Sequence, residues 1–412
     1  MSTALACDRS LEALRNNSSL IRPVMPELDT IRGIAVLGVL FLHGFSWQYA
    51  GLHFAALARK ALAATQPGWL GVNLFFVLSG FLITGILLDS KQVPHFYRTF
   101  YTRRALRILP AYYLLLILLL LLHSSSPGFV GLSIVYLANV TDLFGIACGY
   151  GPLWSLAVEE HFYIFWPAVV HKLSSARLAV VAGAIIVCEP ILRAFCFHLG
   201  KDGLNWYTWF VADGLAAGSL LAIILRSAIS RKRVTQVCGL LLGCAAVIGI
   251  LGKPFGIATQ KRPLGAALQH TTINIFFAGV LLLFLLVGTS SRKHYVNNCV
   301  LRFFGYISYG LYLIHILAFR IYDRICLLYR PSLIPSSDHF ELVLLKFALA
   351  GGSAVAVAYL SRKYFEERFL RIKDRLVPNA VPVRVTSQNL SVPTLFDGSG
   401  KLPAELVPAS SD

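Results

Sequence analysis

Charged residues are scarce in this sequence of 412 residues. They make up 14% of the chain, whereas hydrophobic residues make up 56%. Because soluble domains carry about 25% charged residues, this shortage excludes an ordinary soluble fold and predicts an integral membrane protein. Acidic residues are the scarcer charged class, with 20 Asp and Glu against 37 Lys and Arg. The basic residues cluster between apolar runs, so they indicate loops that face anionic lipid and not a surface that binds nucleic acid.

Motifs for metals, nucleotides and secretion are also missing. The eight cysteines include no C-x-x-C pair, and no spacing resembles a metal site, a P-loop, a nucleophile elbow or a dinucleotide fingerprint. His43, His161 and His315 can in principle meet at a metal ion, but nothing in the sequence requires one, so we expect no metal. Residues 1–26 lack the apolar core of a signal peptide, and the first membrane span is therefore expected to direct insertion.

Long apolar runs are the main positive feature of the chain. Ten of them reach spanning length, about 20 residues, and predict an all-α membrane protein with about ten transmembrane helices. Residues 129–147 are also apolar, but they contain Asn139, Thr141 and Asp142, which favour a re-entrant or interfacial segment over an eleventh span. The ten runs lie near residues 31–50, 69–88, 108–123, 153–171, 177–197, 207–226, 235–252, 271–289, 302–322 and 340–361.

The charges of the loops orient these spans. With ten spans and a cytoplasmic N-terminus, most Lys and Arg fall in cytoplasmic loops, as the positive-inside rule requires. Both termini are therefore expected in the cytoplasm, whereas an eleventh span would reverse every later loop. The chain is divided into a cytoplasmic N-terminal segment (1–26), a ten-span domain (27–376) and a cytoplasmic tail (377–412), whose Pro, Ser, Val and Asn predict disorder.

The first span carries two strongly polar side chains on one helix face. Arg32 and His43 are eleven residues apart, which is three helical turns plus about 20°. Ionisable groups inside a membrane are costly, so a pair on one face suggests a functional site. The alternative is that Arg32 anchors the helix at the lipid headgroups while His43 is an ordinary buried histidine, and position alone does not decide between the two.

Two further clusters of ionisable residues follow. Arg103, Arg104 and Arg107 lie within about one helical turn where the chain re-enters the membrane. Their planar guanidinium groups suit phosphate oxygens, although a topogenic cluster that binds lipid headgroups is an equal alternative. Glu159 and Glu160 lie just below the outer surface in the fourth span. Two adjacent carboxylates cannot both be desolvated cheaply, which favours a functional role.

The remaining spans carry isolated polar groups. Glu189 and Arg193 are spaced i, i+4 and predict an intramembrane ion pair with a structural role. Asp213 lies in a span of small residues, where close helix packing surrounds a buried carboxylate. His315 lies in the outer half of the ninth span, at the same depth as His43 and Glu159.

Five segments of the chain together form a recognisable pattern. They are LDTIRGIAVLGVLFLH at 28–43, GVNLFFVLSGFLI at 71–83, RRALRILP at 103–110, WSLAVEEHFY at 154–163 and SYGLYLIH at 308–315. Taken together, they resemble acyltransferase family 3, the multi-span membrane acyltransferases that include O-acetyltransferases of bacterial O-antigens and other glycans. The resemblance covers about residues 26 to 370. It implies transfer of an acyl group, most simply acetyl, from cytosolic acyl-CoA to a hydroxyl of a glycan or glycolipid at the outer face of the cell membrane.

The family's motif residues can be matched one by one. Arg32 and His43 match the paired Arg and His of the first span, Arg104 and Arg107 match the R-x-x-R pair, and Glu159 matches the acidic residue of the W-S-L motif. The resemblance thus implies a binding site for acyl-CoA as a co-substrate and no tightly bound cofactor.

This sequence also departs from the family pattern. Asn73 stands where many members have Asp, and His161 stands where Gln is common. No hydrolase domain of the SGNH type follows the last span, which puts a two-step relay within this chain in doubt.

Together, the residues and the resemblance predict a path for acyl transfer. We predict that His43 is the general base for the acceptor hydroxyl and that Glu159 orients its imidazole. Direct transfer and an acyl-histidine intermediate both stay open. The predicted substrate-binding residues are Arg32, Arg103, Arg104, Arg107, Asp213 and His315.

The alternative function is a proton-coupled multi-span transporter, in which buried ionisable groups relay protons. A two-half repeat of broken helices would favour it, and the sequence shows no clear repeat of this kind. A non-catalytic scaffold would leave the pair Arg32 and His43 unexplained.

Overall fold

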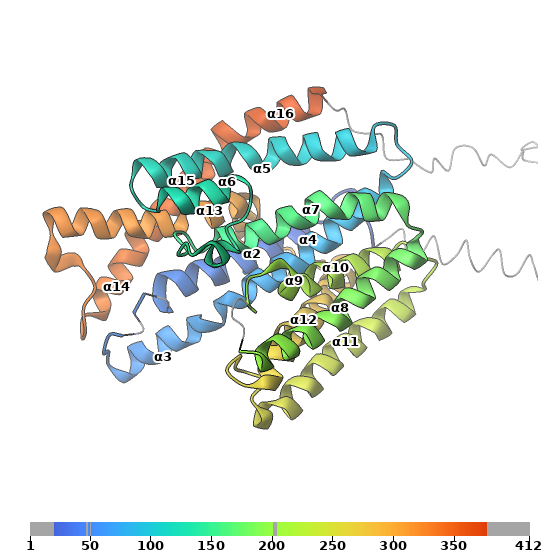
Figure 1. Cartoon of the computed structure of the whole chain (residues 1–412), viewed down its shortest axis with the longest axis horizontal. Coiled ribbons are helices and arrows are strands. Elements are labelled where there is room, and N and C mark those ends of the chain that lie inside the picture. Colours follow the sequence, from blue (N-terminus) through green and yellow to red (C-terminus); the bar gives the residue numbers. More distant parts are fainter. Residues whose placement is uncertain (1–19, 47, 50, 201–203, 377–412) are drawn as a thin grey trace, which may run out of the picture. The chain divides into compact units, whose positions relative to one another are not determined.

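The computed structural model describes residues 20–46, 48–49, 51–200 and 204–376. Every regular element in this part of the chain is a helix (Figure 1), which confirms the prediction of an all-α protein. Most of the predicted cytoplasmic N-terminal segment and the whole predicted tail at 377–412 lie outside the described residues.

The helices follow one another along the chain with short connections. The first half holds α2 (Pro26–Phe41), the π-helical turn η1 (Leu42–Ser46), α3 (Ala56–Thr65), η2 (Gln66–Trp69), α4 (Leu70–Asp89), α5 (Phe96–Leu121), α6 (Pro127–Ile134), η3 (Thr141–Phe144), α7 (Leu153–Lys172) and α8 (Ser175–His198). The second half holds α9 (Thr208–Val211), α10 (Asp213–Ile224), α11 (Arg231–Gly252), η4 (Lys253–Phe255), α12 (Pro263–Gly288), η5 (Lys293–Tyr295), α13 (Cys299–Tyr329), η6 (Pro331–Leu333), α14 (Phe340–Lys346), η7 (Phe347–Gly351), α15 (Gly352–Leu360), η8 (Ser361–Glu366) and α16 (Glu367–Leu376).

Seven helical stretches among the described residues are long and apolar enough to cross a membrane. They coincide with seven of the ten apolar runs, and together with the helical fold they indicate a multi-pass membrane protein. The seven are Pro26–Ser46, Ala56–Asp89, Phe96–Leu121, Ser175–His198, Arg231–Phe255, Pro263–Gly288 and Phe340–Ile372.

The other three runs are also helical but are shorter or more polar. The run at 207–226 is divided at Ala212 into α9 and the 12-residue α10. Helices α7 and α13 carry ionisable side chains such as Glu159 and Arg320 within their length. Each of these helices packs against other helices of the bundle: α13 along α2, α10 along α4, and α7 against α4. Polar side chains are tolerated there because they face the interior of the bundle and not lipid.

The apolar segment at 129–147 does not form a spanning helix. Ser126 caps the N-terminus of α6 by accepting a hydrogen bond from the Phe129 amide. The helix ends after eight residues, and Tyr136 then adopts a left-handed backbone conformation with φ of 61°. The short turn η3 completes the segment. A helix of eight residues is too short to cross a bilayer, in agreement with a re-entrant or interfacial segment.

Glycines allow the helices around the bundle's centre to approach one another closely. A Cβ atom on Gly33 of α2 would lie 1.9 Å from the backbone oxygen of Leu301, and one on Gly305 of α13 would lie 2.0 Å from that of Asp29. In the same way, a Cβ atom on Gly80 of α4 would lie 1.9 Å from the backbone oxygen of Leu215. Small residues at such crossings are the usual means by which membrane helices pack.

A buried ionic network ties α8, α10 and α12 together. Arg193 is 0% exposed, and its Nη2 lies 3.1 Å from the Asp213 carboxylate, while its Nη1 lies 3.8 Å from the Glu189 carboxylate. Thr271 and Asn274 of α12 donate further hydrogen bonds to Asp213, at 2.5 and 2.9 Å. The predicted pair of Glu189 and Arg193 is confirmed, and the shorter distance to Asp213 makes that residue the closer partner. Buried charges persist only when they are paired in this way.

Candidate functional site

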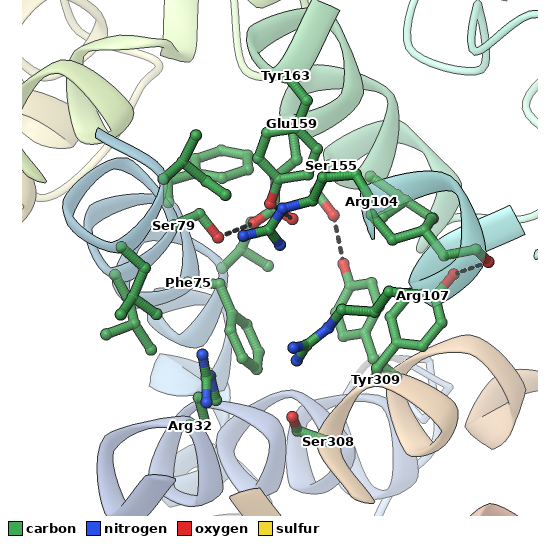
Figure 2. Close-up of a pocket in the computed structure, with 18 of the residues that line it drawn as sticks. Arg32, Phe75, Ser79, Arg104, Arg107, Ser155, Glu159, Tyr163, Ser308 and Tyr309 are labelled. Atoms are coloured by element: carbon green, nitrogen blue, oxygen red, sulfur yellow. Dashed lines mark hydrogen bonds between the residues drawn. The ribbon is translucent and has the colours of Figure 1, made fainter. Parts of the chain in front are cut away.

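A cavity of about 190 Å³ lies between α2, α4, α5, α7 and α13. Figure 2 shows the side chains that line it. The wall formed by α4 is mostly apolar, with Phe75, Phe76 and Leu82 among its residues. The polar residues of the lining are Arg32, Ser79, Arg104, Arg107, Ser155, Glu159, Tyr163, Ser308, Tyr309 and Tyr312.

Three arginines converge on this cavity from two helices. Arg32 comes from α2, and Arg104 and Arg107 come from successive turns of α5, where the spacing of three residues places them on one side (Figure 2). Arg32 donates a hydrogen bond of 2.7 Å to Asp29. The Arg104 guanidinium lies over the Tyr163 ring at 5.3 Å. The cavity is therefore strongly cationic, and guanidinium forks of this kind suit phosphate or carboxylate oxygens.

Glu159 is the acidic residue in the cavity lining. Its Oε1 accepts a hydrogen bond of 2.8 Å from the Ser79 hydroxyl, and its Oε2 accepts one of 3.1 Å from the Tyr163 hydroxyl (Figure 2). Tyr163 is one turn further along α7, as the shared helix face predicts. Both oxygens of Glu159 are therefore hydrogen-bonded, and its carboxyl group shares the cavity with the three arginines.

Two hydroxyl groups in the cavity lining are hydrogen-bonded to each other. The Ser155 and Tyr312 hydroxyls lie 2.5 Å apart, between α7 and α13. The Tyr312 ring packs edge-on against Phe75 with ring centroids 6.0 Å apart. Sequence reasoning did not select Ser155 or Tyr312 for the site. A hydroxyl or a tyrosine in an apolar span gives only a weak signal, because most such groups bond locally or at helix contacts.

His43 lies outside the lining of this cavity, against His315. The two rings are 5.0 Å apart, and His43 Nδ1 is 3.0 Å from His315 Nε2. Arg32 lies in α2, but His43 lies in the π-helical turn η1 that follows the end of α2 at Phe41. The α-helical repeat that was used to place the two side chains on one face therefore does not extend to His43. The extra residue of a π-helical turn re-aims a side chain and is frequent at functional sites. Tyr312 lines the cavity and its ring lies 5.9 Å from that of His315, so the pair of histidines lies next to the cavity lining.

The expected contact between His43 and Glu159 does not form. The hydrogen bonds of Glu159 go to Ser79 and Tyr163, and His315 takes the place next to His43. The reason is that the sequence gives the depth and the face of each side chain but not which helices are neighbours. Because α13 packs along α2, it is α13 that supplies the partner of His43.

Two other predicted substrate-binding residues lie away from the cavity. Asp213 belongs to the buried network with Arg193, and Arg103 is not among the lining residues. His161 does not join the other histidines, since its Nδ1 is 2.7 Å from the Thr208 hydroxyl. Within the described residues, no three His, Cys, Asp or Glu side chains are grouped so that they could hold a metal ion.

Comparison with known proteins identifies the family. A family model described as an acyltransferase domain matches residues 25–363. The chain belongs to this acyltransferase family. The resemblance to acyltransferase family 3 in the sequence is thereby confirmed, and the cavity lies wholly within the matched residues.

Its curated relatives are named as acetyltransferases. The chain is 32% identical over 209 residues to "Putative peptidoglycan O-acetyltransferase YrhL" of Bacillus subtilis, covering 44% of this chain and 30% of the relative. It is 30% identical over 336 residues to the peptidoglycan O-acetyltransferase OatA of Listeria monocytogenes, covering 73% and 50%. It is 28% identical over 300 residues to "Putative acetyltransferase ORF330" of Acidianus two-tailed virus, covering 71% and 82%. The chain spans half or less of the length of the first two relatives, and no solved structure matches it.

Proposed function

We propose that this protein is a membrane O-acyltransferase that moves an acyl group from cytosolic acyl-CoA to a hydroxyl of a glycan or glycolipid. The names of its relatives favour acetyl as the group that is transferred. One observation carries the proposal, namely the convergence of Arg32, Arg104 and Arg107 on one cavity within the acyltransferase domain. The phosphates of CoA are the cytosolic anions that this cluster fits best.

The proposed arrangement in the membrane has ten spans and both termini in the cytoplasm. It rests on the excess of Lys and Arg in the loops assigned to the inside. In this orientation α2 and α5 start at the cytoplasmic surface, Arg32 lies in the first half of α2, and Arg104 and Arg107 lie in the first half of α5. Ser155 lies near the start of α7, which begins at the outer surface. The cavity then leads from the cytoplasmic side toward the outer half of the membrane, and we assign the protein to the cell membrane.

The reaction needs a base that takes the proton of the acceptor hydroxyl. We assign the base to His43, with direct transfer as the simplest chemistry. The acceptor hydroxyl gives its proton to the imidazole as its oxygen attacks the thioester carbonyl carbon. The carbon–sulfur bond then breaks, and the CoA thiolate takes up a proton while the acceptor keeps the acyl group as an ester. In the two-step variant, the His43 nitrogen attacks first and the acyl group passes from it to the acceptor.

Glu159 has a different proposed role from the one that the sequence suggested. It lies among the arginines and is bonded to Ser79 and Tyr163. We assign it to the donor side of the site, where it orients Arg104 and limits how tightly the anionic donor is held.

The proposal is tested with purified protein in lipid nanodiscs. Labelled acetyl-CoA is supplied with peptidoglycan fragments, other glycans or glycolipids, and transfer of label to the acceptor is measured. We expect transfer by the wild-type protein and loss of transfer in the folded variant His43→Ala. Solute flux in proteoliposomes without any label transfer would overturn the proposal in favour of a transporter.

A further inference from the structure

A second cavity, of about 370 Å³, lies where the second half of α13 passes the end of α5. None of its residues lines the first cavity, whose arginines Arg104 and Arg107 lie in the first half of α5. The second cavity is therefore a separate site at the other end of that helix. Its lining combines basic and apolar side chains, and consists of Leu122, His123, Ser124, Arg320, Ile321, Arg324 and Ile325.

The turn that ends α5 places a histidine in this cavity. The Ser124 amide donates a hydrogen bond to the Leu119 oxygen and the His123 amide donates one to the Leu120 oxygen, both of 2.9 Å, which is the bond pattern of a Schellman motif. The left-handed residue of such a motif is usually glycine, but here it is His123, with φ of 48°. A side chain at this position strains the backbone, so a function of the imidazole in the cavity would account for its presence.

The two arginines of the cavity are held in place by backbone oxygens. Arg320 donates hydrogen bonds of 2.6 and 2.9 Å to two such oxygens, and its guanidinium lies over the Tyr150 ring at 5.3 Å. Arg324 donates one hydrogen bond of 2.7 Å to the backbone oxygen of Leu122. A guanidinium group has several more N–H donors than these bonds use. Both arginines can therefore bind a further acceptor without giving up the bonds that fix them.

The positive charge of the cavity is not neutralised within the part of the chain that the structure describes. The lining contains no Asp or Glu. Asp323, next to Arg324 in the sequence, is instead paired with Lys346 at 2.7 Å. In the proposed orientation these arginines lie toward the outer surface, where the positive-inside rule disfavours basic residues, so their presence there needs another reason. An anion supplies it, and phosphate oxygens fit the guanidinium fork.

The apolar part of the lining continues along α13. Ile321 and Ile325 are 39% and 53% exposed, and Leu328, which is 70% exposed, follows them on the same face of the helix. A free phosphate ion would gain nothing from these side chains, whereas the hydrocarbon chain of a lipid would cover them. A basic pocket beside an apolar helix face is the arrangement that binds a lipid headgroup.

We propose that the second cavity is a binding site for an anionic phospholipid. Its phosphate is held by Arg320, Arg324 and His123, and one acyl chain lies along Ile321 and Ile325. A phospholipid with a net negative headgroup fits best because the arginines have no carboxylate to balance them, and because such lipids are the phosphate-bearing amphiphiles that a membrane offers in bulk. The site does not depend on the proposed transfer reaction, since its residues lie outside the first cavity.

Two variants test the site with little disturbance of the fold. His123→Gly removes the imidazole and gives the left-handed position the residue that it favours. Arg324→Gln removes one charge, and Arg330→Gln is its matched control, because Arg330 is an exposed residue at the end of α13 that does not line the cavity. Arg320 is left unchanged because its bonds hold the turn after α5.

Native mass spectrometry of the full chain with added phosphatidylglycerol measures binding. We expect phosphatidylglycerol to bind about 5-fold more weakly to Arg324→Gln, from the loss of one charge near the headgroup. Binding to His123→Gly should weaken about 2- to 10-fold, from the loss of one hydrogen bond, and binding to Arg330→Gln should be unchanged. Unchanged binding in both cavity variants, or an equal loss in Arg330→Gln and Arg324→Gln, would overturn the proposal.

Three other ligands identify what the cavity recognises. Phosphatidylcholine carries a choline that balances its phosphate, so we expect it to bind wild-type protein about 5-fold more weakly than phosphatidylglycerol. Equal affinity for the two lipids would contradict recognition of an anionic headgroup. Inorganic phosphate that binds as tightly as phosphatidylglycerol would show a site for a free anion and not for a lipid. Tighter binding of a polyprenyl phosphate would overturn the assignment to a phospholipid in favour of a lipid carrier.

Discussion

The Ser79 hydroxyl donates a hydrogen bond of 2.8 Å to the Glu159 carboxylate, 80 residues away in the sequence, and both side chains line the cavity. The bond joins α4 to α7 and holds a carboxylate among three arginines. A negative charge at the binding site for an anionic donor weakens binding, so its presence there calls for a compensating role. Limiting the affinity for CoA, and so aiding release of the product, is such a role.

The first prediction concerns this charge. Glu159→Gln keeps the size of the side chain and one acceptor oxygen but removes the negative charge, so CoA should bind about 3- to 10-fold more tightly. Isothermal titration of CoA into the protein in nanodiscs measures the change. Ser79→Ala is the matched control, because it removes the hydrogen bond and retains the charge. Weaker CoA binding in Glu159→Gln would show that Glu159 does not oppose the donor.

The second prediction concerns the arginines of α5. Hydrogen bonds to charged groups contribute about 1.5–3 kcal/mol each, so Arg104→Ala and Arg107→Ala should each weaken CoA binding about 10- to 100-fold. Arg98→Ala is the control, since Arg98 is an exposed residue of the same helix that does not line the cavity. A titration that gives the same affinity for all three variants would point to a role in lipid binding.

The third prediction concerns the pair of hydroxyls of Ser155 and Tyr312 in the cavity lining. Tyr312→Phe and Ser155→Ala each remove the contact of 2.5 Å between Ser155 and Tyr312. We expect either change to let water reach the thioester and to increase hydrolysis of acetyl-CoA several-fold without acceptor. Release of free CoA thiol, followed with a thiol reagent, measures this leak. Phe75→Leu, which alters the neighbouring apolar wall and keeps both hydroxyls, serves as the control.

Several features of the site could be predicted from the sequence because they are local to one helix. The spacing of Arg104 and Arg107 placed both on one side of α5, and the spacing of Glu159 and Tyr163 placed them together on α7. The apolar runs likewise predicted helices, because about 20 apolar residues can satisfy their backbone in a membrane only as a helix. The placement of the side chains uses only the repeat of 3.6 residues per turn.

The contacts between helices could not be predicted in this way. His43 and His315 are 272 residues apart, and nothing in either segment says that the other lies beside it. The partner is chosen by packing, such as the crossing of Gly33 against Leu301 that brings α2 onto α13. The π-helical turn at His43 was also missed, and the ring that packs against it, Phe347, comes from a segment far away in the sequence.

The fourth prediction tests these glycine crossings. Gly80→Ala would place a Cβ atom 1.9 Å from the backbone oxygen of Leu215, so α4 and α10 must separate, at a cost of at least about 1–3 kcal/mol in the free energy of unfolding. Gly239→Ala is the control, because a Cβ atom at Gly239 on α11 would meet nothing within 4 Å. Alanine is the better helix former by about 0.5–1 kcal/mol, so this control should raise stability slightly. Thermal unfolding in detergent compares the two variants.

The fifth prediction concerns the buried network of Arg193, Glu189 and Asp213. Arg193→Met leaves the two carboxylates buried without their cation, which should lower the free energy of unfolding by about 3–5 kcal/mol. Replacing the same cation and both carboxylates together, as Arg193→Met with Glu189→Gln and Asp213→Asn, should recover much of this loss because no buried charge stays unpaired.

An ion pair near the surface provides the comparison for this network. Arg226 and Asp89 are 2.6 Å apart, and the Asp89 side chain is 61% exposed. Arg226→Met should therefore cost less than about 1 kcal/mol. Since Asp213 lies outside the cavity, a charge-neutral triple variant that folds should keep most of its acyl transfer. Loss of transfer in such a folded variant would instead place the network in the path of the substrate, as predicted for Asp213 from the sequence.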